Sequence, residues 1–230
     1  MDNDPKSVAK RRAAEFALSF VRDGQVVGLG TGSTAKYAIE GLAKMVQDGL
    51  NVRGVPTSKA TAQLAKSLGI PLIDLNEASR IDLTIDGADE VDPQFDMIKG
   101  GGGALTREKL VAIASRRRVM LVDETKLVAA LGATRPLPVE VLPFCWVMTA
   151  RRLQALGCEP QPRVVAGQHF LTDNGNYILD CEFPPIQRPA ELETSIKLLP
   201  GVVESGLFVN LADTLVIGFD DRTELRERPA

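Results

Sequence analysis

Histidine is almost absent from this sequence of 230 residues, which contains His169 alone. A metal site with several histidine ligands is therefore excluded, and a Ser/His/Asp or Cys/His catalytic arrangement would have to use that one residue. His169 is flanked by Gln168 and Phe170, and we expect it to be structural. If the chain catalyses proton transfer, carboxylates and lysines are the candidates that remain.

Cysteine is also scarce, with only Cys145, Cys158 and Cys181 in the sequence. An odd number of cysteines without CxxC spacing argues against a disulfide framework and against a zinc ribbon. The expectation is three buried, reduced thiols in a cytoplasmic protein.

Neither a large excess of one charge nor a long apolar run is present. The 27 basic and 30 acidic side chains give a net charge of −3. This balance argues against a nucleic-acid partner and against polybasic membrane binding, so a bound anion must be held by a local cluster. No apolar run approaches the roughly 18 residues of a membrane span, and no signal-peptide pattern is visible. The sequence therefore predicts a soluble, cytoplasmic protein with no membrane partner.

Strand and helix patterns alternate through the first part of the chain. Apolar residues at helical spacing indicate the helices. Short apolar runs that end in glycine or polar residues indicate the strands. Such alternation, with largely apolar strands, predicts a doubly wound, Rossmann-like α/β sheet covered on both faces. Helices are expected at 5–21 with Asp4 as N-cap, at 33–48 with Ser33 as cap, at 58–69, at 106–115 and just after Asp123; strands are expected at 25–29, 51–56, 71–75, 81–86 and 118–122.

The pattern changes near Gly132, where prolines become frequent. The following order of elements is βαββαβ, which predicts an inserted ferredoxin-like α+β domain. We expect domains at 1–131 plus 209–230 and at 132–208, with 214–219 returning to the first sheet and a frayed tail after Asp220. The elements are strands at 139–142, 163–166, 177–183 and 202–208, helices at 144–156 and 189–199, and a primed Asn174-Gly175 turn.

A glycine loop, Gly28–Thr34 with the sequence GLGTGST, follows the first predicted strand. Glycines can turn successive N–H groups toward one point, and the hydroxyls and the next helix N-terminus add donors, so a phosphate is expected there. The alternative is that the glycines only form a tight turn. Ser33 replaces the last glycine of the GxGxxG pattern, and the next strand ends in Val55-Pro56-Thr57-Ser58 without an acid, so a nicotinamide cofactor is disfavoured.

An acidic segment, Asp86–Asp92, directly follows another apolar strand. It does not fit a calcium loop, because Thr84 and Pro93 fall at ligand positions of that pattern, and no metal site is predicted. We expect Asp86 and Asp89 to act in general acid/base chemistry. Glu90 and Asp92 are expected to form a solvated acidic turn.

A third segment, 99–109 with the sequence KGGGGALTREK, contains four consecutive glycines. Their cost in backbone entropy is large, so they are expected where the backbone must approach another group closely. Lys99 can stabilise a developing oxyanion. Glu108 falls in the first turn of a helix, where the dipole favours the carboxylate and so a base, although a glutamate at a helix start is common in itself. Lys126 can reach a phosphate or be simply solvated, and Trp146 is expected in a core.

These three segments and Lys126, in this order and at these intervals, closely resemble the type A ribose-5-phosphate isomerase family over nearly the whole chain. Segments 173–183 (DNGNYILDCEF) and 199–208 (LPGVVESGLF) resemble that family's second domain. The resemblance implies a metal-independent aldose–ketose isomerase without a cofactor. It would interconvert ribose 5-phosphate and ribulose 5-phosphate in the non-oxidative pentose phosphate pathway, as a homodimer or tetramer, with a sugar phosphate as its partner.

The resemblance also implies roles for single residues. Glu108 matches the proton acceptor that moves a proton between C2 and C1, and Asp86 matches a sugar-binding residue that also helps to open the furanose ring. Lys99 begins the strip that polarises the enediolate oxygens. Substrate binding is implied for Thr31, Gly32, Ser33, Thr34, Asp86, Gly87, Ala88, Asp89, Lys99, Gly100, Gly101, Gly102, Lys126 and Lys10.

Two other classes of protein remain open at this point. A non-catalytic sugar-phosphate sensor could keep the glycine loop, but it should lack the Asp86, Asp89, Lys99 and Glu108 set and carry a DNA-binding module. A related deaminase or acyl-CoA transferase should show different residues at the strand ends.

Overall fold

The computed structural model describes residues 5–78 and 80–229, which form two compact units. Unit 1 comprises 5–78, 80–88, 107–127 and 211–229, and unit 2 comprises 89–106 and 128–210. The predicted division kept 1–131 and 209–230 together, whereas here 89–106, 128–131 and 209–210 belong to the second unit. The predicted N-cap, Asp4, lies outside the described residues.

Unit 1 contains a six-stranded sheet in the order β15-β14-β6-β3-β1-β2, in which the last five strands are parallel and β15 is antiparallel. In chain order the parallel strands are arranged 2-1-3-4-5, so the strand order reverses between β1 and β3. The predicted doubly wound sheet is confirmed. Its elements are α1 (Pro5–Ala17), η1 (Leu18–Phe20), β1 (Val26–Leu29), α2 (Ser33–Gln47), β2 (Arg53–Pro56), α3 (Lys59–Ser67), β3 (Leu83–Gly87), α4 (Leu105–Ile113), β6 (Arg118–Asp123), η2 (Glu124–Lys126), β14 (Thr214–Gly218) and β15 (Thr223–Glu227).

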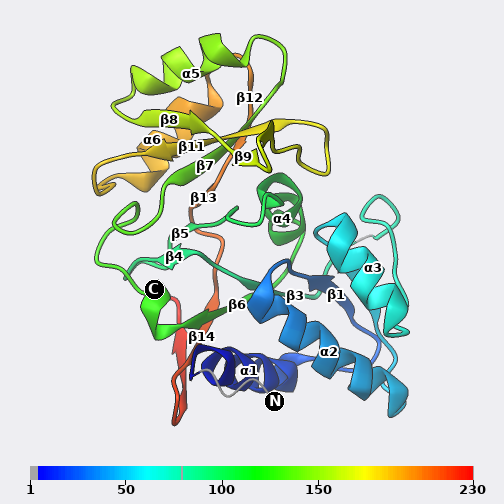
Figure 1. The fold of residues 1–230 in the computed structure, drawn as a ribbon. Helices are drawn as coiled ribbons and strands as arrows, with labels where there is room; N and C mark the ends of the chain where they lie inside the picture. Colours follow the sequence, from blue (N-terminus) through cyan, green and yellow to red (C-terminus); the bar gives the residue numbers. More distant parts are fainter. Residues whose placement is uncertain (1–4, 79, 230) are drawn as a thin grey trace. The chain divides into compact units, whose positions relative to one another are not determined.

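Both faces of this sheet are covered, because alternate residues of β1 enter different cores. Val27 and Leu29 belong to a core that includes apolar residues of α1 and α2, which lie side by side along the sheet (Figure 1). Val26 belongs to a second cluster that includes Val111 of α4. A Cβ at Gly28 would lie 2.7 Å from a methyl carbon of Val111, so this glycine is required for α4 to approach β1 so closely.

Unit 2 has the predicted ferredoxin-like order of elements. Its four-stranded antiparallel sheet runs β12-β7-β11-β8, and two further small sheets are β13-β5-β4 and β10-β9. The predicted strand at 202–208 is divided at Gly206, whose Cβ would meet the Lys99 carbonyl oxygen at 2.3 Å. The elements are β4 (Glu90–Val91), β5 (Met97–Ile98), β7 (Leu137–Val141), α5 (Trp146–Gln154), β8 (Glu159–Pro162), β9 (Val164–Val165), β10 (Gln168–His169), β11 (Tyr177–Glu182), α6 (Pro189–Lys197), β12 (Val202–Ser205) and β13 (Leu207–Phe208).

Several local predictions were wrong. The expected strand at 71–75 is reduced to one bridge between Gly54 and Leu72, and the N-cap of α2 is Gly32, with Ser33 as its first residue. The turn at 173–176 is not a primed turn, because only Gly175 of the Asn-Gly pair has a positive φ and a primed type I turn needs two. Cys145 is exposed, whereas Cys158 and Cys181 are buried as expected.

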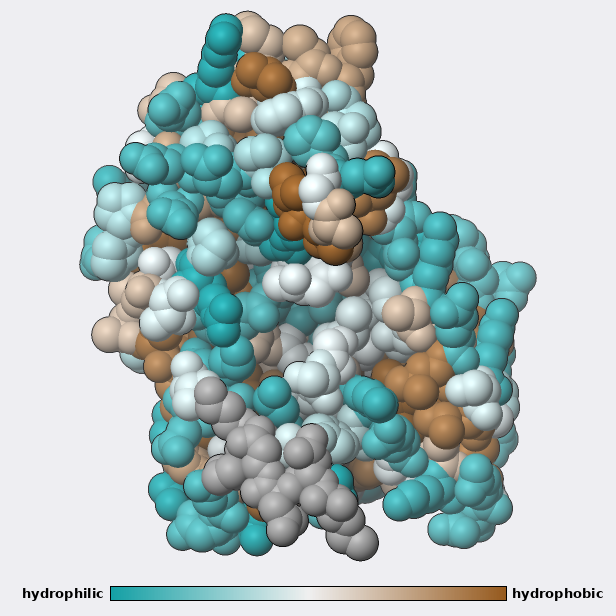
Figure 2. Space-filling view, viewed as in Figure 1, coloured by the Kyte–Doolittle hydropathy of each residue, from teal (hydrophilic) through white to brown (hydrophobic). Residues whose placement is uncertain are grey.

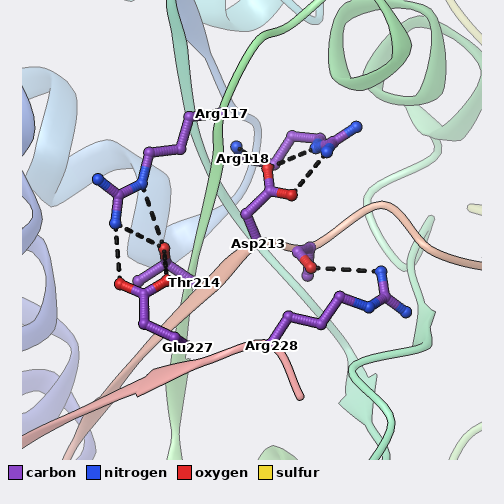
Figure 3. A network of polar contacts seen from close by, with 7 residues as sticks. Arg117, Arg118, Asp213, Thr214, Glu227 and Arg228 are labelled. Atoms are coloured by element: carbon purple, nitrogen blue, oxygen red, sulfur yellow. Dashed lines mark hydrogen bonds and ion pairs between the residues drawn. The ribbon is translucent and has the colours of Figure 1, made fainter. Parts of the chain in front are cut away.

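The charged C-terminal segment is an edge strand and not a frayed tail. β15 pairs along its whole length with β14, and Glu227 at its end joins a polar network with Arg117 and Thr214, beside the pair of Arg118 and Asp213 (Figure 3). Arg117 donates to Glu227 at 2.9 Å and to the Thr214 hydroxyl at 2.9 Å. Arg118 makes a two-pronged ion pair with Asp213, at 2.8 and 2.6 Å. Charged side chains at a sheet edge also oppose pairing with other chains, so this composition suits an edge strand.

The Arg118–Asp213 pair makes the stability of unit 1 dependent on pH. Burial alone would raise the pKa of Asp213, but hydrogen bonds and charge from Arg118, with the charge of Arg228, lower it below its ordinary value. A carboxyl whose pKa is lowered on folding stabilises the protein above the unfolded pKa of about 3.9, and this stabilisation is lost as the pH falls through the folded pKa. We expect Asp213→Asn to lower the free energy of unfolding at pH 7 and the difference from wild type to shrink below about pH 4. Urea unfolding at both pH values measures this difference, and a difference that stays constant with pH would refute the assignment.

Candidate active site

The glycine loop, the acidic segment and the stretch that holds Lys126 begin at one edge of the unit 1 sheet. β1, β3 and β6 are adjacent and parallel, and their registers pair Leu29 with Ile85 and Gly87 with Leu121. The loops after these strands therefore start side by side, at the carboxyl edge and on both sides of the point where the strand order reverses. Open α/β sheets bind ligands at this position.

The glycine loop contacts the end of β3 directly. A Cβ at Gly30 would lie 2.2 Å from Oδ1 of Asp86 and 2.6 Å from its Cα, so no other residue fits there without displacing the backbone. Oδ1 of Asp86 accepts hydrogen bonds from the backbone N–H groups of Thr31, at 3.1 Å, and of Gly87, at 2.8 Å. Asp86 is 1% exposed. The carboxylate predicted for acid/base chemistry thus fixes the glycine loop as well.

The hydroxyl of Thr31 belongs to a cluster of hydroxyl groups that sequence reasoning missed. Its Oγ1 lies 2.8 Å from Thr57 Oγ1, 2.9 Å from Ser58 Oγ and 3.1 Å from Thr61 Oγ1. Ser58 is also the N-cap of α3 and accepts from the Thr61 N–H. The segment after β2 was noted in the sequence only because it lacks an acid. Its hydroxyl residues were the available signal that this segment supports the loop.

The exposed part of the glycine loop is formed by Gly32 and Ser33, where α2 begins. Gly32 has a φ of 110°, and nothing lies within 4 Å of the position of its missing Cβ. The Lys10 ammonium group donates to Ser33 Oγ at 3.1 Å. Thr34 lies beside the end of β3, since a Cβ at Gly87 would be 4.0 Å from Thr34 Cβ. Within unit 1, the structure therefore brings together the loop, Lys10 and the end of β3.

Glu108 and Lys126 also belong to unit 1. Glu108 lies in the first turn of α4 and is 5% exposed, and the positive end of the helix dipole favours its ionised form. Lys126 is half-buried in η2, directly after β6. Glu108 thus lies in the first turn of a helix and Lys126 lies directly after a strand, which are the positions that the sequence predicted for them.

In unit 2, the glycine strip Lys99–Gly103 follows β5. Lys99 is 3% exposed, and its ammonium nitrogen lies 5.4 Å from the centre of the Phe208 ring. Gly100 and Gly103 have positive φ values of 106° and 79°, and a Cβ at Gly103 would lie 2.4 Å from the Phe170 ring. The strip is therefore glycine-rich for the expected reason, because its backbone turns and approaches a neighbouring side chain closely.

Asp89 contacts this strip through a hydrogen bond. Its Oδ2 accepts from the Gly101 N–H at 2.8 Å. Its own N–H donates to the Ile98 carbonyl oxygen at 2.9 Å. Of the expected site residues in unit 2, Asp89 and Gly101 are thus in direct contact, while Gly101 and Gly102 are exposed.

Glu90 and Asp92 do not form the solvated turn that was expected. Glu90 is fully buried and Asp92 is 8% exposed. Glu90 accepts from the N–H groups of Gly132, Thr134 and Arg135 at 2.6 to 2.9 Å and from the Thr134 hydroxyl at 2.6 Å. These donors lie more than forty positions later in the sequence, so local spacing gave no signal of them.

Two aromatic residues of unit 2, Trp146 and Tyr177, contact the ring of His169. The His169 ring lies 5.3 Å from Trp146 and 4.8 Å from Tyr177, measured between ring centres. His169 is exposed and Trp146 is half-buried. The ring contacts of His169 are compatible with the structural role expected from its sequence context.

Neither a metal-binding cluster nor a membrane-spanning helix is found in the part of the chain that the structure describes. Across 5–78 and 80–229, no group of three or more His, Cys, Asp or Glu side chains is arranged to hold a metal ion. Within the same described ranges, no helix is both long and apolar enough to span a membrane.

Comparisons with known proteins agree in pointing to one family. The model of the family described as ribose 5-phosphate isomerase A (phosphoriboisomerase A) matches residues 53–222. A ribose-5-phosphate isomerase A of Gloeobacter violaceus is 56% identical over 219 residues, covering 95% of each chain. The structure of ribose 5-phosphate isomerase A from Methanocaldococcus jannaschii matches with a TM-score of 0.91 at 40% identity, covering 95% of this chain and 98% of that one. A D-ribose-5-phosphate isomerase in complex with phospho-erythronic acid matches with a TM-score of 0.93 at 39% identity, covering 96% and 98%.

Proposed function

We propose that this chain moves the proton of its reaction with Glu108. The chain belongs to the ribose 5-phosphate isomerase A family and interconverts ribose 5-phosphate and ribulose 5-phosphate. Membership is decided by a family model that spans most of the chain and by a relative of 56% identity. The sensor, deaminase and transferase alternatives have no comparable support. The roles of single residues in the reaction are proposed from the geometry within each unit.

Glu108 is the proposed base, and the observation that carries this role is a buried carboxylate in the first turn of a helix. It is 5% exposed, and the N-terminus of α4 favours its ionised form. In the open-chain aldose, Glu108 takes the proton from C2, and the electron pair moves into the C1–C2 bond while O1 gains the negative charge. Glu108 then returns the proton to C1, as a second proton moves from O2 to O1.

Asp86 and Asp89 are the proposed binding and relay groups for the sugar oxygens. Two backbone N–H groups donate to Oδ1 of Asp86 and hold the carboxylate in one orientation at the end of β3. The position of Oδ2 is therefore fixed as well. Opening of the furanose ring requires a proton to move from the C1 hydroxyl to the ring oxygen, and a fixed carboxylate can carry it. Asp89 is assigned to the sugar with Gly87 and Ala88.

The oxyanion of the enediolate is assigned to Lys99 and to the N–H groups of the glycine strip. Lys99 supplies a buried positive charge, which is worth more there than in water because little solvent screens it. Gly100, Gly101 and Gly102 let the backbone approach the substrate without side chains in between. Charge stabilisation and one base are sufficient for proton transfer through a cis-enediolate, so the proposed mechanism uses no metal and no cofactor.

The phosphate is assigned to the start of α2 with two lysines. Gly32, Ser33 and Thr34 present N–H groups and hydroxyls at a helix N-terminus, where an anion is favoured. The contact between Lys10 and Ser33 at 3.1 Å supports the inclusion of Lys10. Lys126 is the second proposed cation. Thr31 acts by fixing the loop, because its N–H donates to Asp86 Oδ1 and its hydroxyl lies among three others.

A direct assay tests the proposed metal-independent reaction. The purified chain is incubated with D-ribose 5-phosphate, and ketose formation is followed before and after exhaustive chelation. Equal rates are expected. A rate that is lost on chelation and restored by Mg²⁺ would contradict the proposed mechanism, and no conversion under either condition would contradict the function itself.

Self-association into a dimer or tetramer and a cytoplasmic location belong to the same proposal. Unit 2 exposes Phe144 at 88%, with Val164, Val165 and Leu171 each more than half exposed. Figure 2 shows hydrophobic side chains gathered over the part of unit 2 where Figure 1 labels β9. Apolar groups of this kind support an interface between copies.

The free thiols of Cys145, Cys158 and Cys181 suit a reducing compartment, which supports the proposed cytoplasmic location.

A further inference from the structure

Arg163 holds the glycine strip from one side through its guanidinium group. It stands between β8 and β9, and its side chain is 15% exposed. Nη1 donates to the carbonyl oxygens of Gly100, at 2.9 Å, and of Gly101, at 3.1 Å. All of these residues belong to unit 2. No motif of the sequence pointed to Arg163, which lay inside a predicted strand.

The guanidinium group of Arg163 is itself held in one orientation by Asp180 and by the backbone around Arg163. Nε and Nη2 donate to the two carboxylate oxygens of Asp180, at 2.9 and 2.5 Å, which is the two-pronged geometry that arginine alone provides. The backbone N–H of Arg163 donates to the Ile178 carbonyl at 2.8 Å, and its carbonyl accepts from Phe170 at 2.9 Å. The orientation of Nη1 is therefore set by β11 and its neighbours, not by the strip.

These contacts determine the direction of the N–H groups in the strip. In a planar trans peptide the C=O and the following N–H point in opposite directions. The peptide between Gly100 and Gly101 is held at both ends, by Arg163 at its oxygen and by Asp89 at its nitrogen. The next peptide has its oxygen on Arg163, so the Gly102 N–H points away from the arginine.

Packing alone does not supply this restraint. A cavity of about 270 Å³ adjoins the strip and is lined by Gly101, Asp89, Arg163, Asp180 and neighbouring residues. Glycines lose more conformational freedom on folding than any other residue, so a strip of four beside a cavity needs specific hydrogen bonds to stay in one conformation.

We propose that Arg163, held by Asp180, is a positioning residue for the isomerase reaction, because it fixes the Gly100 and Gly101 carbonyls and so aims the Gly102 N–H at the enediolate. This inference rests on the proposed function. Arg163 also polarises the peptide between Gly101 and Gly102 through its oxygen, which makes the Gly102 N–H a stronger donor to an oxyanion. Its effect falls on the charged intermediate more than on the bound substrate.

Replacement of Arg163 tests this proposal. Arg163→Met keeps an unbranched apolar stem and removes all donors, and Arg163→Lys keeps the charge without the two-pronged pair. For Arg163→Met we expect kcat to fall about 10- to 100-fold, as for a misplacement of roughly 1 Å, with KM for ribose 5-phosphate changed less than about threefold. The kcat of Arg163→Lys should fall between that of Arg163→Met and that of wild type. Affinity for phospho-erythronic acid, whose planar carboxylate resembles the enediolate, should fall by about the same factor as kcat.

Arg118→Met is the matched control, because Arg118 makes the same two-pronged pair with Asp213 in unit 1 at similar exposure. The Arg118→Met variant should be less stable than wild type, but its kcat should stay within about twofold of the wild-type value. The proposal is overturned if Arg163→Met and Arg163→Lys keep kcat within about twofold, or if phospho-erythronic acid binds both as tightly as wild type. Should Arg163→Met not fold, Arg163→Lys alone decides through the same two measurements. A wild-type chain that does not convert ribose 5-phosphate would instead refute the proposed function.

Discussion

Glu108→Gln is expected to reduce kcat for ribose 5-phosphate by about 100- to 10,000-fold while KM changes little. Glutamine keeps the size and hydrogen-bonding capacity of the side chain but cannot accept the C2 proton. The residue is buried in the first turn of α4, so water cannot replace it easily as the base. Steady-state kinetics on the purified variant measure both constants. The free energy of unfolding should stay within about 1 kcal/mol of wild type, because the change is nearly isosteric.

Glu191→Gln provides the control for Glu108→Gln. Glu191 also lies in the first turn of a helix, α6, but its side chain is 67% exposed. The control therefore carries the same chemical change in the first turn of a helix, and its kcat should equal that of wild type. A Glu108→Gln enzyme with near-wild-type kcat would refute the base assignment. A large rise in KM at constant kcat would instead make Glu108 a substrate-binding residue.

Glu90→Ala is expected to lower the free energy of unfolding by about 3 to 5 kcal/mol. Glu90 is fully buried and receives four hydrogen bonds from the 132–135 loop, three of them from backbone N–H groups. Backbone donors cannot turn toward another acceptor without moving the loop. Each donor left unsatisfied costs about 1 to 3 kcal/mol. Urea unfolding followed by circular dichroism measures the loss.

Two further variants separate this effect from a general loss of charge. Glu90→Gln retains one carbonyl oxygen and should be destabilised less than Glu90→Ala. Glu182→Ala removes an exposed carboxylate from the end of β11 in the same unit and should stay within about 0.5 kcal/mol of wild type. A loss below about 1 kcal/mol for Glu90→Ala would mean that the loop finds other partners.

The sequence was most informative where physical patterns are local. Apolar runs identified β1, β3, β6 and β14, and helical spacing identified α2 and α4, because these patterns follow from backbone geometry and burial. The glycine loop was recognisable for a similar reason. Gly30 is required by its approach to Asp86, and such requirements leave a visible residue type. Fold class and family were therefore predictable from the chain alone.

Features that depend on distant partners were not predictable. Glu90 looked like part of a solvated acidic turn, because its donors come from residues 132–135. Arg163 looked like an ordinary strand residue, because its partners Gly100 and Asp180 lie on different elements. β15 looked like a frayed tail, because an edge strand can carry charges on both sides. In each case tertiary hydrogen bonds, rather than local preference, decided the structure.

Isomerisation in deuterated water tests the central claim most directly. If Glu108 carries the proton between C2 and C1 through an enediolate, part of that proton exchanges with solvent before it is returned. Ribulose 5-phosphate formed at low conversion should then contain solvent deuterium at C1, as measured by NMR or mass spectrometry. Ketose that forms at the normal rate with only the original C2 hydrogen at C1, and no deuterium, would indicate direct hydride transfer and contradict the account.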